Sequence, residues 1–487
     1  MHYAREIRRG AWVNAVGLVA KAALPLSYLV LTRLFGSELF GQYLLAFFIA
    51  NLFGSALGTG FMNAVTIFAA PAAGDGDEAG LLDVTASALR ASLGLGLGFA
   101  VLAWFVAGPF CAAIYPELHG LRTGLILLSF GMVPEMLTRV AVGLGKAHLQ
   151  MRWDPLLLGL AGPTLQVLLG LGAWDMDLGL SGLFWSMFLS QTLVGVGSLM
   201  LLGRFLPLRA LWSAGLSRRS GQAGLLSFGL VQSANMGVTR YASRVDVMML
   251  GAMGMPAWQL GWYATAAMIT SEIRQLRIIF AAIATPLVAR AKQAGEMYAL
   301  GTTLARLSRA STLLAFPTVM LAIVVLGSVL TLFDPHYTHA PFLLVLLVTP
   351  TLSCAYGLSG NFLVATGHNR MNLMNATITA VLNTGLNALL IPSHGLLGAA
   401  AATATAQAVQ VALENTELWK LERVRLPVSG LLRPLVLFAP PFVLLVQTHS
   451  SDSMAGRALI ATAALLLALV AHAASGLFKR QPTGGLS

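Results

Sequence analysis

The sequence alternates between long apolar runs and short polar breaks along its whole length. A run of about 20 apolar residues is what an α-helix needs to cross a bilayer. We therefore predict an all-α integral membrane protein with about fourteen spanning helices. The predicted helices occupy residues 11–33, 40–69, 86–109, 121–145, 155–174, 179–203, 224–251, 259–287, 311–333, 341–366, 372–392, 396–419, 431–448 and 457–478. The breaks between them are too short to hold a soluble catalytic domain.

Composition narrows the class of protein further. Of the 487 residues, 57% are hydrophobic and only 10% are charged, whereas an ordinary soluble domain is about 25% charged. A soluble fold with so few charges could not cover its surface. This excludes secreted enzymes, nucleic-acid-binding proteins and disordered scaffolds. The two cysteines, Cys111 and Cys354, lie far apart in apolar surroundings, so they predict neither a disulfide framework nor a metal or redox site.

The basic residues predict how the chain is oriented in the membrane. Lys and Arg number 30 against 19 acidic residues, giving a net charge of +11. Cytoplasmic loops of membrane proteins are enriched in Lys and Arg. With a cytoplasmic N-terminus, 20 of the 30 basic residues lie in predicted inner segments. Only Arg33, Arg122 and Arg457 lie in outer loops. We therefore predict that both termini are cytoplasmic. Because the first apolar run continues to Leu31, we also predict that the first span is not a cleaved signal peptide.

Three short patterns recur at a nearly constant spacing and predict an internal repeat. They are Gly41-Gln42-Tyr43 with Gly261-Trp262-Tyr263, Gly145-Lys146 with Gly367-His368, and Gly179-Leu180-Ser181-Gly182 with Gly395-Leu396-Leu397-Gly398. The offsets are 220, 222 and 216 residues. A duplicated six-helix unit explains all three, and because six is even, both copies enter the membrane from the same side. The predicted organisation is an N-terminal lobe (1–205), a cytoplasmic linker (206–222), a C-terminal lobe (223–425) and two added helices (426–487).

Four segments of the chain resemble bacterial O-antigen and polysaccharide flippases. Residues 34–43, Leu-Phe-Gly-Ser-Glu-Leu-Phe-Gly-Gln-Tyr, are similar to the loop between the first two helices of that family. Residues 235–251, with Arg244-Val245-Asp246, resemble its seventh helix. Residues 333–337, Phe-Asp-Pro-His-Tyr, resemble the turn after its ninth helix. Residues 389–400, with Ile391-Pro392 and Gly395, resemble the hairpin between its eleventh and twelfth helices.

This family belongs to the multidrug/oligosaccharidyl-lipid/polysaccharide export superfamily. The resemblance implies a transporter of the bacterial inner membrane rather than an enzyme. Its substrate would be an undecaprenyl-pyrophosphate-linked oligosaccharide, flipped by alternating access for lipopolysaccharide O-antigen, capsule or exopolysaccharide biosynthesis. The expected partners are this lipid and the bilayer, without nucleic acid. The protein would act as a monomer, alone or with polysaccharide assembly proteins.

Cationic residues inside the predicted spans are the candidate substrate contacts. Charged residues at the centre of a span are costly, so each marks a functional hypothesis. Lys21 lies in the first predicted helix, and Arg274 and Arg277 share a face of helix 259–287. Arg can grip phosphate oxygens through two hydrogen bonds. Related peptidoglycan-precursor flippases also carry cations in helices 1 and 8, a likeness that supports Lys21 and Arg274 by position. Glu272 would compete with the substrate.

Each of these residues also has an ordinary structural explanation. Glu272 could neutralise a neighbouring arginine, although residues two apart on a helix point in different directions. Lys21 could extend to the membrane surface. On helix 121–145, Glu135 and Arg139 have the spacing of an intrahelical ion pair, which is the interpretation we favour. On helix 224–251, Arg240 and Arg244 are expected to share one face.

A second set of polar residues is the candidate site for a coupling ion. Asp246, Asn383, Asn387 and Thr403 lie on the predicted helices 7, 11 and 12. Carboxylate, amide and hydroxyl oxygens are ligands for a hard cation, and relatives have a sodium site built from the same three helices. No cofactor is expected beyond coupling to Na⁺ or H⁺. The alternative is that Asp246 pairs with an arginine while the amides and hydroxyls bridge helices.

Two other functions fit the helix pattern. A multidrug and toxin extrusion transporter would have the same architecture, but a cavity for cationic drugs should carry buried acids, and this sequence has more buried bases. A membrane O-antigen polymerase or ligase would need catalytic groups and a large outer loop. Every predicted outer loop is short.

Overall fold

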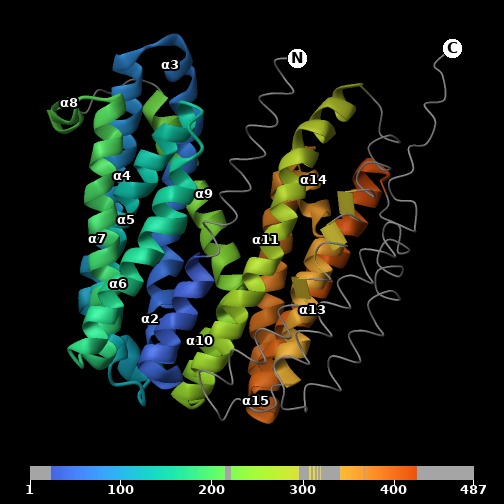
Figure 1. Ribbon diagram of the computed structural model, residues 1–487. Coiled ribbons are helices and arrows are strands. Elements are labelled where there is room, and N and C mark those ends of the chain that lie inside the picture. The colour runs from blue at the N-terminus through green and yellow to red at the C-terminus, as the bar shows by residue number, and fades with distance from the viewer. Residues whose placement is uncertain are drawn as a thin grey trace. The chain divides into compact units, whose positions relative to one another are not determined.

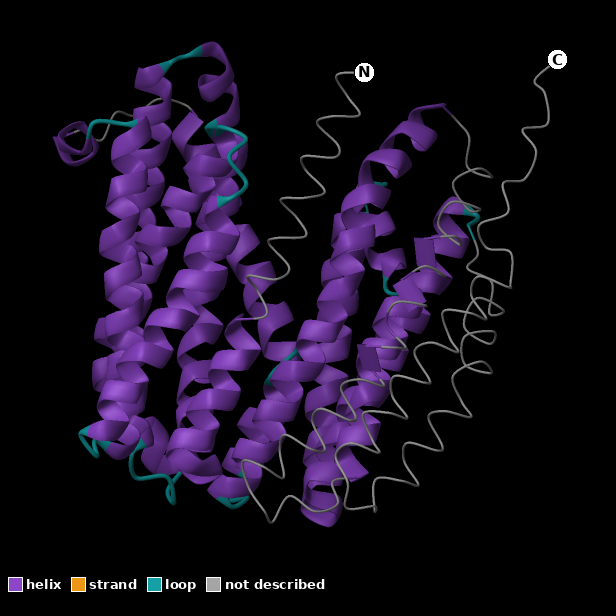
Figure 2. Ribbon diagram, viewed as in Figure 1, coloured by secondary structure: helices purple, strands orange, loops and turns teal. Residues whose placement is uncertain are grey.

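The computed structural model describes residues 23–213, 221–294, 307–308, 311–312, 315, 318–319, 341–366 and 368–424. Every element assigned in this part of the chain is a helix (Figures 1 and 2). The elements are α2 (Ala23–Phe68), α3 (Ala70–Asp75), α4 (Glu78–Ile114), α5 (Leu121–Ala147), the π-helix η1 (Pro155–Ala161), α6 (Gly162–Asp175), α7 (Gly179–Phe205), α8 (Leu208–Ser213), α9 (Gly221–Ala242), α10 (Val245–Ala252), α11 (Ala257–Ala294), α13 (Pro341–Tyr356), α14 (Leu358–Ala365) and α15 (Asn369–Glu422).

Six helical stretches among the described residues are long and apolar enough to cross a membrane. They are Ala23–Phe68, Glu78–Ile114, Leu121–Ala147, Pro155–Asp175, Gly179–Phe205 and Arg370–Glu422. Helices α13 and α14 form a seventh candidate if they are taken together as one broken span. The predicted class, an all-α membrane protein, is thereby confirmed, and the count of fourteen spans stays a prediction. Residues 431–448 and 457–478, Lys21 and most of 311–333 lie outside the described residues.

The outer surface of α4 has the character of a surface that contacts lipid. Leu102, Trp104 and Phe105 expose 58%, 56% and 72% of their surface. A water-soluble protein rarely leaves so large an apolar patch uncovered. Acyl chains would cover these side chains without cost, which agrees with a membrane location.

Two of the long helices are each made of two segments that fold back at a glycine. Helix α2 has 46 residues, about 70 Å if it were straight, whereas the hydrocarbon layer is about 30 Å thick. Gly36, with φ of 78°, breaks it, and glycine tolerates this backbone region best. The rings of Tyr28 and Phe40 then lie 5.7 Å apart, although twelve helical residues span about 18 Å. The break falls between the predicted helices 11–33 and 40–69.

Helix α15 turns in the same way at Gly395, whose φ is 53°. A Cβ atom added at Gly398 would clash with the carbonyl oxygen of Leu390, yet eight residues of straight helix span about 12 Å. The chain therefore forms a tight hairpin here. Its position matches the predicted boundary between helices 372–392 and 396–419.

The chain divides into two compact units, each considered on its own below. The first contains residues 1–265 and 376–402, and the second contains residues 266–375 and 403–487. In the first unit, α2 packs against α5 and α9, while α5 also packs against α4 and α7 (Figure 1). The packed side chains of this unit include Phe61, Val65, Leu89, Val140 and Leu201. The predicted division into two six-helix lobes stays a prediction.

Two glycines from the predicted repeat meet within the first unit. A Cβ atom added at Gly41 would lie 2.6 Å from the backbone nitrogen and 2.8 Å from the Cα of Gly261. Only residues without a side chain permit so close a backbone approach. Gly41 and Gly261 are equivalent positions of the predicted repeat. Equivalent positions can touch only near the two-fold axis that relates the two copies, so a two-fold repeat would produce such a contact.

Basic side chains gather at one end of the first unit. Arg152 and Arg204 both lie over the ring of Trp153, at 5.0 and 5.3 Å from its centroid. Lys146 forms an ion pair with Asp154 at 2.6 Å. Tryptophan and basic residues are enriched where a span leaves the hydrocarbon layer. These bases are among those that the charge count assigns to the cytoplasm, and the orientation itself remains a prediction.

One predicted helix is interrupted. We predicted a continuous helix over residues 224–251, but α9 ends at Ala242 and α10 begins at Val245. At the break, the Ser243 hydroxyl and the Ser243 backbone nitrogen both donate to the Arg240 carbonyl oxygen, at 2.8 and 3.2 Å. Arg244 has a φ of −138°. The expectation that one regular helix carries Arg240 and Arg244 on a shared face is therefore wrong.

Candidate functional site

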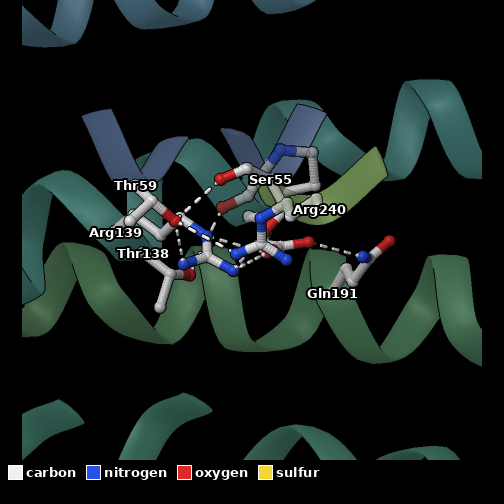
Figure 3. A network of polar contacts seen from close by, with 8 residues as sticks. Ser55, Thr59, Thr138, Arg139, Gln191 and Arg240 are labelled. Carbon is white, nitrogen blue, oxygen red and sulfur yellow. Dashed lines mark hydrogen bonds and ion pairs between the residues drawn. The ribbon is translucent and has the colours of Figure 1, made fainter. Parts of the chain in front are cut away.

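A polar network connects four helices of the first unit (Figure 3). We call it the arginine network; its members are Ser55 and Thr59 of α2, Glu135 and Arg139 of α5, Gln191 of α7 and Arg240 of α9. Glu135 and Gln191 lie beside the midpoints of Leu121–Ala147 and Gly179–Phe205. The network therefore sits about halfway along α5 and α7, and Arg240 reaches it from near the C-terminal end of α9.

Glu135 and Arg139 are the centre of this network. The Arg139 Nε and Nη2 atoms donate to Glu135 Oε1 at 2.8 and 2.5 Å. Their side chains are only 14% and 12% exposed. The second carboxylate oxygen, Oε2, accepts from Gln191 Nε2 at 2.8 Å. The intrahelical pair predicted from the sequence is confirmed, and α7 fixes its acidic partner.

Arg139 also extends to α2. Its Nη1 atom donates to Thr59 Oγ1 at 2.9 Å, and its Nη2 atom donates to Ser55 Oγ at 2.8 Å. Gly58 leaves the room for this, because a Cβ atom there would lie 2.5 Å from Arg139 Cδ. The guanidinium group thus joins α5 to α2, in addition to pairing within its own helix.

Arg240 is the charged member that the sequence did not connect to the Glu135–Arg139 pair. Its Nη2 atom donates to Thr59 Oγ1 at 3.4 Å, while the Thr59 hydroxyl donates to the Ser55 carbonyl oxygen at 2.7 Å. A hydroxyl oxygen has two acceptor sites, so the two arginines fill both. The Nε atom of Arg240 is buried and has no hydrogen-bond partner among the described residues.

The two guanidinium groups are close enough to repel each other. Both donate to one oxygen atom, so the donor nitrogens are no more than about 6 Å apart, where like charges repel by about 3 kcal/mol at an effective dielectric constant of 20. Glu135 provides the only carboxylate within the network. A third arginine, Arg244, lies over the Phe48 ring, 4.7 Å from its centroid. The network as defined carries one excess positive charge, which is suited to an anion.

Arg277, a predicted substrate contact, lies at a helix break in the second unit. Helices α13 and α14 are bent by 47° where they meet, and Arg277 Nη1 donates to the Gly357 carbonyl oxygen there at 2.6 Å. Glu414 of α15 is 3% exposed and accepts from Gln410 Nε2 at 2.9 Å. A Cβ atom at Gly360 would lie 2.9 Å from its carboxylate.

The two charges match the two helix ends that meet at the break. Arg277 lies at the C-terminal end of α13 and Glu414 lies beside the first turn of α14. A cation is favourable at a helix C-terminus and an anion at an N-terminus. Sequence reasoning did not single out Glu414, because it falls near the polar end of a predicted helix. Arg274 and Glu272, the other predicted contacts on α11, are partly buried, and Lys21 lies outside the described residues.

The residues predicted to hold a coupling ion are in part placed together. Asp246 is 2% exposed; its Oδ2 accepts from Tyr263 Oη and its Oδ1 from the Val247 nitrogen, both at 2.8 Å. Asn387 Nδ2 donates to Asn383 Oδ1 at 2.8 Å. Thr403 belongs to the second unit, so its geometry to these residues is not defined.

Amide bridging, the alternative interpretation of the two asparagines, is observed. Asn383 Nδ2 also donates to the Ala242 carbonyl oxygen at 3.2 Å, between α15 and α9. The described residues contain no group of three or more His, Cys, Asp or Glu arranged to hold a metal ion. The cation site therefore stays a prediction.

Comparison with known proteins gives a family and a fold. The profile of the family described as "Polysaccharide biosynthesis protein" matches residues 30–334. No curated protein matches the sequence.

Several solved structures share the fold. The lipid II flippase MurJ in an inward closed conformation is similar with a TM-score of 0.71 and 14% identity, over 95% of this chain and 99% of that one. An inward-facing multidrug resistance MATE family transporter of the MOP superfamily has a TM-score of 0.66 and 17% identity, over 85% and 99% of the two chains. The eukaryotic MATE transporter AtDTX14 has a TM-score of 0.61 and 14% identity, over 89% and 100%. At these identities the likeness establishes the fold alone.

Proposed function

Because the chain belongs to the polysaccharide biosynthesis protein family, we propose that it is a transporter that flips a lipid-linked oligosaccharide across the bacterial inner membrane. The substrate would be an undecaprenyl-pyrophosphate-linked oligosaccharide used for lipopolysaccharide O-antigen, capsule or exopolysaccharide. The fold shared with MurJ and with MATE transporters agrees with a transport function.

The excess of arginine over carboxylate in the arginine network is the observation that supports an anionic substrate. Two guanidinium groups and one carboxylate meet about halfway along the apolar spans α5 and α7. A pyrophosphate must cross the membrane with its negative charge, which is costly unless cations replace its hydration. Guanidinium groups provide both the charge and paired hydrogen bonds to phosphate oxygens.

The residues predicted from the sequence would extend this cationic path. Lys21, Arg274 and Arg277 would contact the pyrophosphate, and Glu272 would compete for an arginine and promote release. Two lobes would alternate between inward-open and outward-open states, while the polyprenyl tail stays in lipid. Asp246, Asn383, Asn387 and Thr403 would bind a coupling Na⁺, or Asp246 would carry a coupling H⁺.

The excess positive charge also favours this function over export of cationic drugs. A MATE-type exporter has the same fold, but its cationic substrates would be repelled by a network that is itself cationic. A polymerase or ligase would need catalytic groups for glycosyl transfer. Glycosyl transfer by the purified protein would overturn our choice.

Complementation of a flippase-deficient host tests the proposal. We expect the wild-type chain to restore surface glycan, and we expect Arg274→Ala combined with Lys21→Ala to reduce it strongly. Arg122→Gln is the matched control, because Arg122 is exposed at the start of α5. A drug-susceptibility panel should remain unchanged in the same cells. Drug resistance without restored glycan would contradict the proposal and favour a drug exporter.

A further inference from the structure

We propose that Arg139 and Arg240 form a diphosphate-binding site in which Glu135 is a resident competitor for Arg139. This inference rests on the proposed function and deepens it. It assigns the pyrophosphate to residues of α5 and α9 that the sequence analysis did not place at the substrate.

The first observation is that the two guanidinium groups converge on one point. Arg139 Nη1 and Arg240 Nη2 both donate to Thr59 Oγ1, at 2.9 and 3.4 Å (Figure 3). A diphosphate has two phosphoryl groups joined by a shared oxygen. Its terminal oxygens can accept from both arginines at once, whereas a single carboxylate cannot balance both charges.

The second observation is that the two arginines differ in how fully they are bonded. Arg139 donates to Glu135, Thr59 and Ser55 through all three of its nitrogen atoms. Arg240 donates to Thr59 at the long distance of 3.4 Å, and its buried Nε has no partner among the described residues. A buried donor without a partner is costly, and an anion would relieve that cost.

The third observation is the way in which Glu135 is held. One of its oxygens receives two bonds from Arg139, and the other receives the Gln191 amide at 2.8 Å. A Cβ atom at Gly131 would clash with Gln191 Oε1, so this glycine leaves the room for the amide. When a diphosphate takes Arg139, Glu135 keeps its bond to Gln191. The carboxylate therefore stays beside the site and can reclaim Arg139 when the substrate leaves.

A purely structural ion pair would not need Arg240. Glu135 and Arg139 neutralise each other, and Ser55 and Thr59 satisfy the remaining contacts to α2. Arg240 adds a second positive charge with no second acid in the network, so it raises the cost of folding. A bound anionic ligand would balance that second positive charge.

Binding of inorganic pyrophosphate to the purified full-length protein in nanodiscs tests this inference. We expect Arg240→Gln to weaken binding by at least about tenfold, since it removes one of two charge-assisted contacts. Glu135→Gln should tighten binding by about tenfold, since it removes the competitor. Gln191→Ala, which leaves every charge in place, should weaken binding by a smaller factor, because Glu135 then lacks the amide bond that stabilises it once the diphosphate takes Arg139. Arg122→Gln should bind like the wild type. Thermal unfolding of each variant reports whether it is folded.

A short-chain polyprenyl pyrophosphate, tested alongside, separates a lipid-borne diphosphate from a free one. Tighter binding of the polyprenyl form supports the lipid as the source. Equal pyrophosphate affinity in folded Arg240→Gln and wild-type protein would overturn the inference, as would weaker binding by folded Glu135→Gln. If the variants follow the expected order but surface glycan does not depend on the protein, the diphosphate site stands and the proposed function fails. If glycan depends on the protein while Arg240→Gln binds normally, the inference alone fails.

Discussion

The arginine network of the first unit and the broken span of the second unit use buried arginines differently. Arg139 and Arg240 approach each other through side chains, with one carboxylate, Glu135, for two positive charges. Arg277 instead donates to a backbone carbonyl at the bend between α13 and α14, and Glu414 lies at the other side of that bend. The contrast shows that the contacts of a buried arginine, and not only its position in a span, indicate its role: one set of contacts gathers positive charge, and the other holds a bent backbone.

The difference shifts the expected roles of these residues. From the sequence alone, Arg277 is a substrate contact and Arg139 is part of an intrahelical pair. The geometry gives Arg277 a clear structural bond, to a backbone carbonyl oxygen at the bend between α13 and α14. In the arginine network, by contrast, the geometry leaves one positive charge without an acidic partner in the network. Three sets of substitutions test whether this contrast is real.

The largest effect should come from breaking the ion pair of the arginine network. Arg139→Gln leaves Glu135 as a buried carboxylate without its cation, which typically costs about 3–5 kcal/mol. We expect a large fall in the melting temperature of the detergent-solubilised protein. The double variant Arg139→Gln with Glu135→Gln should recover most of that loss, because no charge is left unbalanced. A double variant as unstable as the single one would show that the charge balance is not what matters.

A smaller loss of stability should follow from removing the contact at the broken span. Arg277→Gln removes a hydrogen bond from a charged donor to the Gly357 carbonyl, worth about 1.5–3 kcal/mol. If the role of Arg277 is mainly to hold the bend, pyrophosphate affinity should change less than it does in Arg240→Gln. Loss of affinity equal to that of Arg240→Gln, in a folded protein, would erase the distinction between the two regions.

The smallest effect should come from crowding the arginine network without changing its charge. A Cβ atom at Gly58 would press on Arg139 Cδ, and overpacking of this kind costs about 1–3 kcal/mol, less any gain of up to about 1 kcal/mol from helix propensity. Gly98→Ala is the matched control, since its Cβ atom would meet nothing within 4 Å. We expect unfolding experiments to show Gly58→Ala as less stable than Gly98→Ala. Equal stability of the two variants would show that Arg139 moves aside freely.

Apolar run length and charge spacing predicted much of the fold. Predicted helix 121–145 corresponds to α5 at Leu121–Ala147, and 179–203 corresponds to α7 at Gly179–Phe205. The pairing of Glu135 with Arg139 also follows from spacing alone, because i, i+4 neighbours on a helix must face each other. These features depend on residues that are close in the sequence.

The parts that could not be predicted depend on contacts between distant residues or on a break within a predicted helix. Arg139 and Arg240 meet at Thr59, and nothing in the periodicity of α5 or α9 specifies which face of α2 they share. The break between α9 and α10 at Ser243 and Arg244 lies inside an apolar run that shows no turn signal. Lys21, Arg274, Arg277 and Glu272 remain predicted substrate contacts, because their role requires a bound substrate to be tested.

Transport by Arg240→Gln is the most direct test of an anion path through the arginine network. The measurement is the initial rate at which purified protein in proteoliposomes flips a fluorescent polyprenyl-pyrophosphate-linked saccharide. Wild-type protein and Arg122→Gln would be measured at the same protein density. We predict that Arg240→Gln is folded and flips the lipid at least about tenfold more slowly, while Arg122→Gln matches the wild type, since one lost charge-assisted contact corresponds to about a factor of ten or more. Equal rates for all three proteins would contradict the account.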